Sequence, residues 1–485
     1  MQDGRDRRIG VLERDLADLK KVVQALVADN GRLHSENEAM RGEMAALRAE
    51  NDELKRRLGQ NSSNSSKPPS SDSPSDRDAR PGKKPSGRRR GGQPGHKGVR
   101  RELLTPTSPP VDCYPALCRR CDKDLPRRRD PDPIRHQTVD VPRITAVVSE
   151  WRLHRVTCEC GAVTCARLPD GVPQGMCAPG LMALIALLTG DYNLSRRRAV
   201  SLLNDVLGVD ISLGALSGVE ESVSEVLEAP CQEIRAHVAE QPVKHSDATN
   251  WSLAGKARTL WTIATACATA FFITEDASMP GLRGLFAKIK GILVSDRGRQ
   301  FAFWAMDKRQ ICWAHLIRKF AAFGEQGGAV GRMGESLLLL SRTMIHCWHQ
   351  VRDGTMPRAK FQRIVGNLIP LVEGHLQVGV DLGVRGVSGS CKDILDHRSA
   401  MWTFVREPGV EPTNNNAERA LRAFVLWRKA SFGSQSDRGC RFAERIMTVT
   451  HTLRKQKRHV LSYLTLACQA ALRGEPVPSL LNTIP

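Results

Sequence analysis

Residues 413–422 have the sequence Thr-Asn-Asn-Asn-Ala-Glu-Arg-Ala-Leu-Arg, and this stretch organises the rest of the chain. Thr and Asn side chains accept hydrogen bonds from the open N–H groups of a first helical turn, and Ala, Leu and Arg then favour propagation. Apolar residues at 417, 421, 424 and 425 recur at helical spacing, which leaves Glu418 at the border of the buried stripe. The pattern predicts a helix that points Glu418 along the edge of the surface that the helix covers. An ordinary capped surface helix is the alternative.

The chain carries a large excess of positive charge. Its 485 residues include 72 Lys and Arg against 52 Asp and Glu, a formal net charge of +20. Such an excess indicates a polyanionic partner, nucleic acid before a membrane surface. No run of about 18 apolar residues occurs, and the N-terminus has no apolar signal core, so we expect a cytoplasmic, nucleoid-associated protein without a membrane partner. On the predicted helix the DNA-binding candidates are Arg419, Arg422, Arg428 and Lys429.

The first 58 residues carry a heptad repeat. Leu or Met occupies every seventh position from 12 to 54, and positions 9, 16, 23 and onward to 58 complete the second seam. Leu at d with Asn30, Asn37 and Asn51 at a favours a parallel two-stranded coiled coil, because a buried Asn is best satisfied by its twin across the seam. We expect a homodimer or a higher homo-oligomer; a long helix packed on its own chain is the alternative.

Residues 59–111 are polar and basic. They begin with Asn-Ser-Ser-Asn-Ser-Ser-Lys-Pro-Pro-Ser-Ser-Asp at 61–72, a composition that cannot bury enough apolar surface to fold alone. Ten Lys or Arg and one acid follow between 77 and 101. Arg88, Arg89 and Arg90, followed by two glycines, are typical of arms that lie along phosphates or enter a minor groove. These three are DNA-binding candidates, with a merely solvated linker as the alternative.

Fourteen cysteines in a cytoplasmic chain favour metal ligands or buried thiols over disulfides. Cys118 and Cys121 have zinc-knuckle spacing, and a second pair about 37 residues on can complete a tetrahedral thiolate site. Expected short strands over 138–148 and 151–157 suit a zinc ribbon. The predicted Zn²⁺ ligands are Cys118, Cys121, Cys158 and Cys160, with Cys113 or Cys165 as a replacement for one of them.

Residues 178–229 have a helical pattern. The segments 194–207 and 212–227, separated at Gly208, have the proportions of a helix-turn-helix with basic residues at one end. Helix pairs joined at a glycine are common in any α domain, so sequence-specific DNA recognition here is one of two interpretations.

Beyond residue 241 the period changes to that of strands. Strands are expected over 243–251, 259–266, 268–274, 291–296 and 310–314, with a short helix over 281–290 before the fourth strand. This is the order of an RNase H-like core, in which acids on the first and fourth strands lie beside each other at one edge. Asp247 and Asp296 occupy those positions, and Glu418 on a later helix fits the missing third acid; Glu407, Glu411 and Glu444 are alternatives.

Three converging carboxylates repel one another unless metal ions lie between them. Mg²⁺ or Mn²⁺ ions held by Asp247, Asp296 and Glu418 would activate a water or a 3′ hydroxyl for in-line displacement at phosphorus. The gap from 316 to 410 is too long for a loop and contains helical patterns over 335–351 and 358–378, which predicts a helical insertion. Cys312 and His315 also have metal-ligand spacing, but we interpret them as a strand end that places His315 and Arg318 toward the site or DNA.

Several motifs together resemble one known family. They are the Asn-Ser-rich run at 61–72, the cysteine cluster, Val-Ser-Asp at 294–296, Gln-Ile-Cys-Trp-Ala-His-Leu-Ile-Arg at 310–318, and residues 413–422 followed by Trp-Arg-Lys at 427–429 and Ser-Phe-Gly at 431–433. Over nearly its whole length the chain is similar to the insertion sequence 66 family of bacterial transposases. Family members usually have Asp-Glu-Thr where this chain has Asp247-Ala248-Thr249.

The resemblance implies a DDE-type transposase with the triad Asp247, Asp296 and Glu418. It also implies a leucine zipper, a zinc-binding domain, and a catalytic core with a helical insertion. The expected partners are DNA, as element ends and target, and small accessory transposition proteins. The expected activity is metal-dependent strand cleavage and strand transfer; a catalytically decayed or repurposed DNA-binding protein of the same origin is the alternative.

The predicted fold is a multidomain α+β protein with an N-terminal parallel coiled coil, a zinc-ribbon-like domain, a helical DNA-binding domain and an RNase H-like α/β catalytic core with an all-α insertion. The predicted divisions are a coiled coil at 1–58, a disordered basic linker at 59–111, the zinc-ribbon-like domain at 112–170, the helical domain at 171–240, the first part of the core at 241–315, the insertion at 316–410, and the Glu-bearing and closing helices at 411–485.

Overall fold

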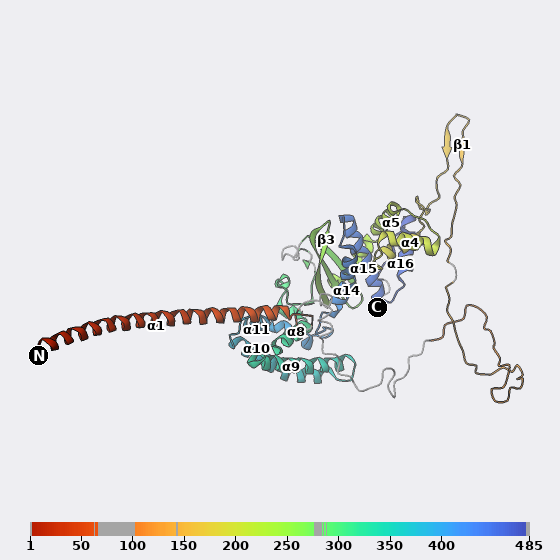
Figure 1. Ribbon diagram of the computed structural model, residues 1–485. Helices are drawn as coiled ribbons and strands as arrows, with labels where there is room; N and C mark the ends of the chain where they lie inside the picture. The colour runs from red at the N-terminus through yellow and green to blue at the C-terminus, as the bar shows by residue number, and fades with distance from the viewer. Residues whose placement is uncertain are drawn as a thin grey trace. The chain divides into compact units, whose positions relative to one another are not determined.

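The computed structural model describes residues 2–62, 64–65, 102–141, 144–275, 284, 286–287 and 289–481. The expected mixed α+β class is confirmed, since the described chain combines many helices with a five-stranded mixed sheet (Figure 1). Contacts divide the chain into two units, Met1–Arg80 with Ala314–Leu395 and Pro81–Trp313 with Asp396–Pro485. Within the described residues, no helix is both long enough and apolar enough to cross a membrane.

The first unit contains the heptad segment as one helix. Helix α1 runs without a break over Gln2–Leu58, about 85 Å at 1.5 Å per residue. The turn after it is closed by Asn64, whose Nδ2 donates to the Gly59 carbonyl oxygen at 3.0 Å and to Glu325 Oε2 at 2.8 Å. The described seam side chains are about half exposed, as an unpaired coiled-coil strand would be; they are Leu19, Leu26, Leu33, Met40, Leu47 and Leu54.

The same unit holds the helices predicted between the last strand and the Glu418 helix. The two helices predicted over 335–351 and 358–378 are confirmed as α9 and α10, and each extends beyond its predicted range. The observed helices of this region are α8 (Trp313–Gly324), which begins at the last residue of the second unit, α9 (Gly328–Arg352), α10 (Arg358–Asp381) and α11 (Ser388–Asp396), which ends one residue past the first.

The second unit begins with the cysteine segment, where the expected strands are mostly wrong. Residues 138–141 and 144–148 form no strand, and of 151–157 only β1 (Arg155–Thr157) does, paired antiparallel with β2 (Val163–Cys165). Residues 142 and 143 lie outside the described residues. The physical reason is that these residues pack on nothing: Val139 and Val147 are 62% and 94% exposed, and among the described residues of this segment the paired strands are β1 and β2.

The predicted helix pair follows and is confirmed. The side chains of Ser195 and Ser212 accept hydrogen bonds from N–H groups of the first turns of α4 (Arg196–Leu207) and α5 (Leu213–Val226). Gly208 ends α4 in the left-handed conformation with φ 66°. The neighbouring helices are α3 (Pro179–Thr189) and α6 (Glu228–Glu240).

Five strands form the sheet at the centre of this unit. They are β3 (Val243–Leu253), β4 (Lys256–Ala264), β5 (Thr269–Thr274), β6 (Ile292–Ser295) and β7 (Arg309–Ile311). Their order is β5-β4-β3-β6-β7, with β3–β4 and β4–β5 antiparallel and β3–β6 and β6–β7 parallel. The first four strand predictions and the predicted adjacency of the first and fourth strands are therefore confirmed. The fifth, over 310–314, is correct only at its start, because β7 ends at Ile311 and α8 begins at Trp313. Half of the helix predicted over 281–290 lies outside the described residues.

The C-terminal helices pack on the sheet or on the helices beside it. They are α12 (Arg398–Met401), α13 (Thr403–Arg406), α14 (Asn415–Ser431), α15 (Asp437–Lys455) and α16 (Val460–Leu472). Helix α14 packs on β3 and β4, and α15 on β5 (Figure 1). Phe424 of α14 lies with its ring centroid 4.8 Å from that of Phe271 and 5.4 Å from that of Trp251, so the apolar stripe read from the sequence is the packed face.

Candidate active site

Two of the predicted carboxylates lie in one row across paired strands. Strand β3 pairs with β6 from Val243↔Ile292 to His245↔Val294, a constant offset of 49 residues. The paired residues end at His245↔Val294, and the same offset, continued for two residues, leads from Asp247 to Asp296 (296 − 247 = 49), which directly follows β6. Neighbouring strands are about 4.8 Å apart, and residues in one row point to the same face. Both side chains are half-buried, so they are positioned by the sheet and open to solvent.

The row continues to Cys312 and from there to Glu418. Strand β6 pairs with β7 up to Ser295↔Ile311, which places Asp296 beside Cys312, and the Cys312 N–H donates to the Ser295 carbonyl oxygen at 2.9 Å. The Cys312 thiol in turn lies 3.9 Å from Glu418 Oε1. The first turn of α14 therefore brings the third predicted acid to the end of the row that starts at Asp247.

The face that carries this row is the one covered by α14. Asp247 pairs with Thr262, and Thr262 with Phe271, so all three point to one side of the sheet. Phe271 is the residue that packs on Phe424 of α14. Helix and carboxylates thus occupy the same side, as an acid contributed by a covering helix requires.

Asn414 fixes the start of α14, in a way the sequence interpretation missed. Its side chain does not cap the helix, so the predicted Asn cap is wrong. Instead Nδ2 donates to the Ser246 carbonyl oxygen at 2.8 Å, and the main-chain N–H donates to Cys312 Sγ at 3.2 Å. The residue is fully buried, and a buried carbonyl between strands has a stronger need of a donor than a solvent-facing helix end.

The three carboxylates do not form one tight cluster. Among the residues that the structure describes, Asp247, Asp296 and Glu418 are not a set whose ligand oxygens all lie within 4.8 Å of one another. Like charges separate unless cations lie between them, and in two-metal sites the ions themselves are about 3.5–4 Å apart. Carboxylate oxygens are the donors that hard divalent ions prefer.

Glu444, an alternative for the third acid, makes contacts with β5 and with Arg235. It lies on α15, accepts a hydrogen bond from the Ile273 N–H of β5, and forms an ion pair with Arg235 at 3.4 Å. Burial raises its pKa, opposed by the Arg235 charge. These contacts hold α15 on β5. Glu407 and Glu411 lie in the segment between α13 and α14.

Comparison with models of protein families shows the family to which this chain belongs. The model described as "Transposase IS66 family" matches residues 174–442, which is 269 of the 485 residues and includes the whole sheet and Glu418. The chain belongs to the transposase IS66 family. Transposition is therefore its functional class, with DNA as a partner and a divalent metal implied. A second model, a family of unknown function (DUF6444), matches residues 12–102. Comparison with curated proteins finds no match.

In this member of the IS66 family, a buried histidine and two cationic side chains lie near Asp247. His245 lies two residues before Asp247 on the same face, and burial lowers its pKa to about 4, helped by Lys455 and Arg419. The imidazole is therefore neutral near pH 7. Lys455 donates to the Thr265 carbonyl oxygen at 2.8 Å and to Asn416 Oδ1 at 3.0 Å, and burial lowers its pKa to about 8. Nothing in the local pattern at residue 455 signalled this position, because it depends on the packing of α15.

The predicted DNA-binding residues lie in three parts of the chain, namely α14, α8 and the basic block at 88–90. Arg419, Arg422 and Lys429 are exposed on one side of α14. Arg428 is half-buried and donates to Thr249 Oγ1 at 3.1 Å and to the Asn250 carbonyl oxygen, so it also anchors α14 to β3. Arg318 lies half-buried on α8 in the first unit. The block Arg88, Arg89 and Arg90 lies outside the described residues.

The helix pair α4–α5 lacks the charge expected of a DNA-reading helix. Helix α5 would be the recognition helix, yet its charged residues are Glu220, Glu221 and Glu225, and it has no Lys or Arg. Recognition helices lie against phosphates and bases and are basic. The exposed cations of this region are at the start of α4 instead, at residues 196–198.

The predicted zinc ligands lie in two similar turns. Cys118 and Cys121 flank one turn, and Cys158 and Cys160 lie in the β1–β2 turn. Backbone N–H groups of Arg120 and Cys121 lower the pKa of the Cys118 thiol, and that of Cys160 lowers the pKa of Cys158, which favours the thiolate form that zinc requires. In the described part of the chain, no three of these sulfurs lie within 4.8 Å of one another.

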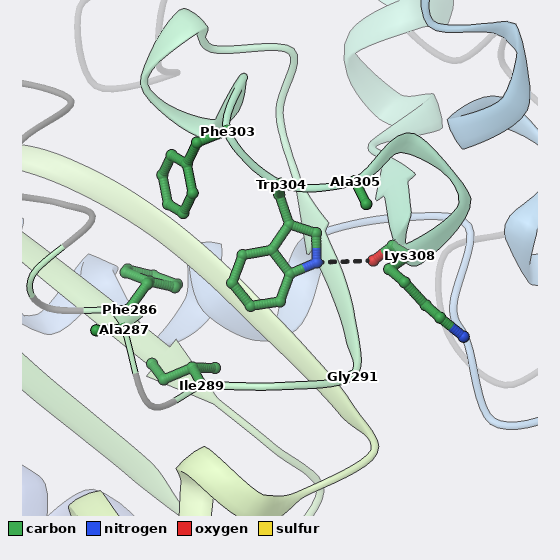
Figure 2. A pocket seen from close by; sticks show the side chains of 8 residues that line it. All are labelled: Phe286, Ala287, Ile289, Gly291, Phe303, Trp304, Ala305 and Lys308. Carbon is green, nitrogen blue, oxygen red and sulfur yellow. Dashed lines mark hydrogen bonds between the residues drawn. The ribbon is translucent and has the colours of Figure 1, made fainter.

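One pocket lies away from the carboxylates. It has a volume of about 470 Å³ and is lined by Phe286, Ala287, Ile289, Gly291, Phe303, Trp304, Ala305 and Lys308 (Figure 2). The Trp304 indole N–H donates to the Lys308 carbonyl oxygen at 3.1 Å. Phe301, which packs on Phe286, stacks edge-on against Trp261, and Trp261 points to the opposite face from its neighbour Thr262. The pocket therefore belongs to the face without the acids.

Proposed function

We propose that this chain is a DDE-type transposase in which Asp247, Asp296 and Glu418 hold Mg²⁺ or Mn²⁺ and cleave and join DNA strands at the ends of an insertion sequence. The observation that carries the proposal is the shared row of Asp247, Asp296 and Cys312, with Glu418 3.9 Å from the Cys312 sulfur. The strand order and directions support an RNase H-like core. Small accessory proteins are further proposed partners.

In the proposed reaction, residues of this chain position the carboxylates and provide positive charge near them. Bound divalent ions would stabilise the charge of an in-line displacement at phosphorus and activate the attacking hydroxyl. The Gly298 N–H donates to Asp296 Oδ1 at 2.9 Å, and buried Arg309 donates to the Asp296 carbonyl oxygen at 2.7 Å, which fixes the loop that carries this acid. Lys455 and Arg419 place positive potential near the row, which attracts a phosphate backbone.

Ala248 does not argue for the noncatalytic alternative. It follows Asp247 in β3, so its side chain points to the opposite face of the sheet. An acid at this position would therefore not belong to the row. Replacement of the family's usual glutamate by Ala248 leaves Asp247, Asp296 and Glu418 on their common face.

A supercoiled-plasmid assay tests the function. A plasmid that carries the two ends of the element should yield nicked, linear and strand-transfer products with Mg²⁺ or Mn²⁺ and none with EDTA. Tight DNA binding without metal-dependent cleavage would instead establish the decayed or repurposed protein. A coiled-coil scaffold with no DNA role predicts weak DNA affinity with little salt dependence.

We further propose that α1 pairs with α1 of a second copy. Aspartates at Leu33 and Met40 together should convert the dimer to monomer, because they place charges in the apolar seam. The matched control places aspartates at Ser35 and Ala39, off the seam of the same helix. Light scattering of the full chain gives the mass. A dimer that survives the seam substitutions would contradict this pairing.

Zinc binding is proposed from the two cysteine turns. Purified protein should contain about one zinc ion per chain, and Cys118→Ser combined with Cys158→Ser should remove it, because thiolates are the required ligands. Elemental analysis by mass spectrometry measures the content. Single Cys113→Ser and Cys165→Ser variants identify a replacement ligand. Full zinc content in the double variant would rule out this site.

A further inference from the structure

Phe432 is the most exposed aromatic side chain among the residues that the structure describes. Its exposed fraction is 78%, against 55% for Tyr192 and 48% for Trp151. It directly follows α14, the helix that carries Glu418. An aromatic ring held in solvent at this position has no role in the core, since neighbouring Phe424 and Trp251 supply that packing.

The backbone holds this ring in an unusual conformation. Phe432 has φ 59°, in the left-handed region that a bulky side chain rarely adopts. Such conformations persist only where the surroundings fix them, and they cluster at ligand-binding positions. The Phe432 N–H donates to the Arg428 carbonyl oxygen at 2.8 Å, which ties the residue to the last turn of α14.

The residues after Phe432 are fixed to the end of β3. The Ser434 N–H donates to the Ser252 carbonyl oxygen at 2.8 Å, and the Ala254 N–H donates to the Ser434 carbonyl oxygen at 2.8 Å. Gly433 has φ 103°, and a Cβ there would lie 2.3 Å from the Ser252 carbonyl oxygen, so only glycine fits. The ring is therefore presented from a turn that is attached on both sides.

The exposed side of α14 leading to this ring is basic. Arg419, Arg422 and Lys429 are exposed at spacings of three and seven residues, which places them along one side of the helix. Lys429 is three residues before Phe432. A row of cations that ends in an exposed aromatic ring is complementary to a nucleic acid, which offers phosphates and stacked bases together.

We propose that Phe432 is a wedge that inserts between two base pairs of the duplex bound along α14. This proposal rests on the proposed function, because Glu418 defines where the cleaved strand lies. Fourteen residues separate Glu418 from Phe432 (432 − 418 = 14), about 21 Å of helix. At about 3.4 Å per base pair, the wedge contacts the step about six base pairs from the cleaved phosphate. Apolar wedges of this kind unstack and kink DNA.

Phe432→Gly is the informative variant, because glycine keeps the left-handed turn and removes only the ring. Duplexes from the DNA that flanks this coding sequence carry 2-aminopurine at successive positions, and binding is measured without divalent metal. The wild-type chain should raise 2-aminopurine fluorescence at one step about six base pairs from the cleaved end. Phe432→Gly should abolish that signal and bind about 5- to 100-fold more weakly, as expected for loss of one base–aromatic stack.

Leu466→Ala is the matched control, since it removes another exposed apolar side chain of the same unit, on α16. It should leave both readouts unchanged. Unfolding temperatures of the variants verify folding. Wild-type affinity and fluorescence in Phe432→Gly would overturn the wedge, as would a change in oligomeric mass, which would assign Phe432 to a contact between copies. Failure of the wild-type chain to bind the duplex at all would count against the proposed function instead.

Discussion

Asp296→Asn is expected to lower metal-dependent DNA cleavage by about a thousandfold or more, because it removes one of the negatively charged ligands proposed to hold the divalent ion. Asp296 directly follows β6, the strand that pairs with β3, which carries Asp247. Asparagine keeps the shape and can still accept the Gly298 N–H, so the fold and DNA affinity should be preserved. Conversion of supercoiled plasmid, followed over time in Mg²⁺, measures the loss.

The matched control is Asp307→Asn, an exposed acid in the same β6–β7 connection. It should cleave at the wild-type rate, which separates a specific role from a general effect of charge. Asp247→Asn and Glu418→Gln should resemble Asp296→Asn. Undiminished cleavage by any one of the three would remove that residue from the triad.

Asn414→Ala should have the second-largest effect. It removes the donor to the Ser246 carbonyl oxygen and leaves this buried oxygen unpaired, which lowers the free energy of unfolding by about 1–3 kcal/mol. It also loosens the start of α14 against β3, and a displacement of about 1 Å at Glu418 lowers the cleavage rate by about a hundredfold. Urea unfolding and the plasmid assay measure the two effects.

Asn415→Ala is the control, because Asn415 is the exposed neighbour in the same run of asparagines. Its stability and cleavage rate should stay near those of the wild type. Equal behaviour of Asn414→Ala and Asn415→Ala would contradict a role of Asn414 in positioning α14 on β3. The same conclusion would follow if Asn414→Ala lowered the stability but left the cleavage rate unchanged at a temperature where the variant is fully folded.

The strands could be predicted from the sequence because they depend on local periodicity. The short apolar run at 292–295 indicates a buried strand, and the position of Asp296 at its end can be seen in the sequence. The partner strands were predictable too, since the order of elements limits the topologies. The register that gives both acids the same offset needed the structure, because one residue of slip would have turned Asp247 to the other face.

The tertiary contacts of the site could not be predicted in this way. A run of asparagines before a helix indicates a cap, but Asn414 serves β3 instead, because a buried carbonyl competes successfully with local capping. Lys455 reaches the site only through the packing of α15 on β5. Likewise, the strand expected over 138–148 is not formed by the described residues 138–141 and 144–148. The contacts of Asn414 and Lys455 depend on residues far away in the sequence and leave no periodic pattern, so they could not be predicted from the sequence.

The late position of α14 in the chain sets the order in which the protein gains its chemistry during synthesis. Asp247 and Asp296 leave the ribosome well before Glu418, and α1 precedes all three. A nascent or prematurely terminated chain that stops before residue 415 would contain the segment proposed for self-association but an incomplete set of acids. Under the proposed pairing of α1, such a fragment would bind a full-length copy without contributing Glu418.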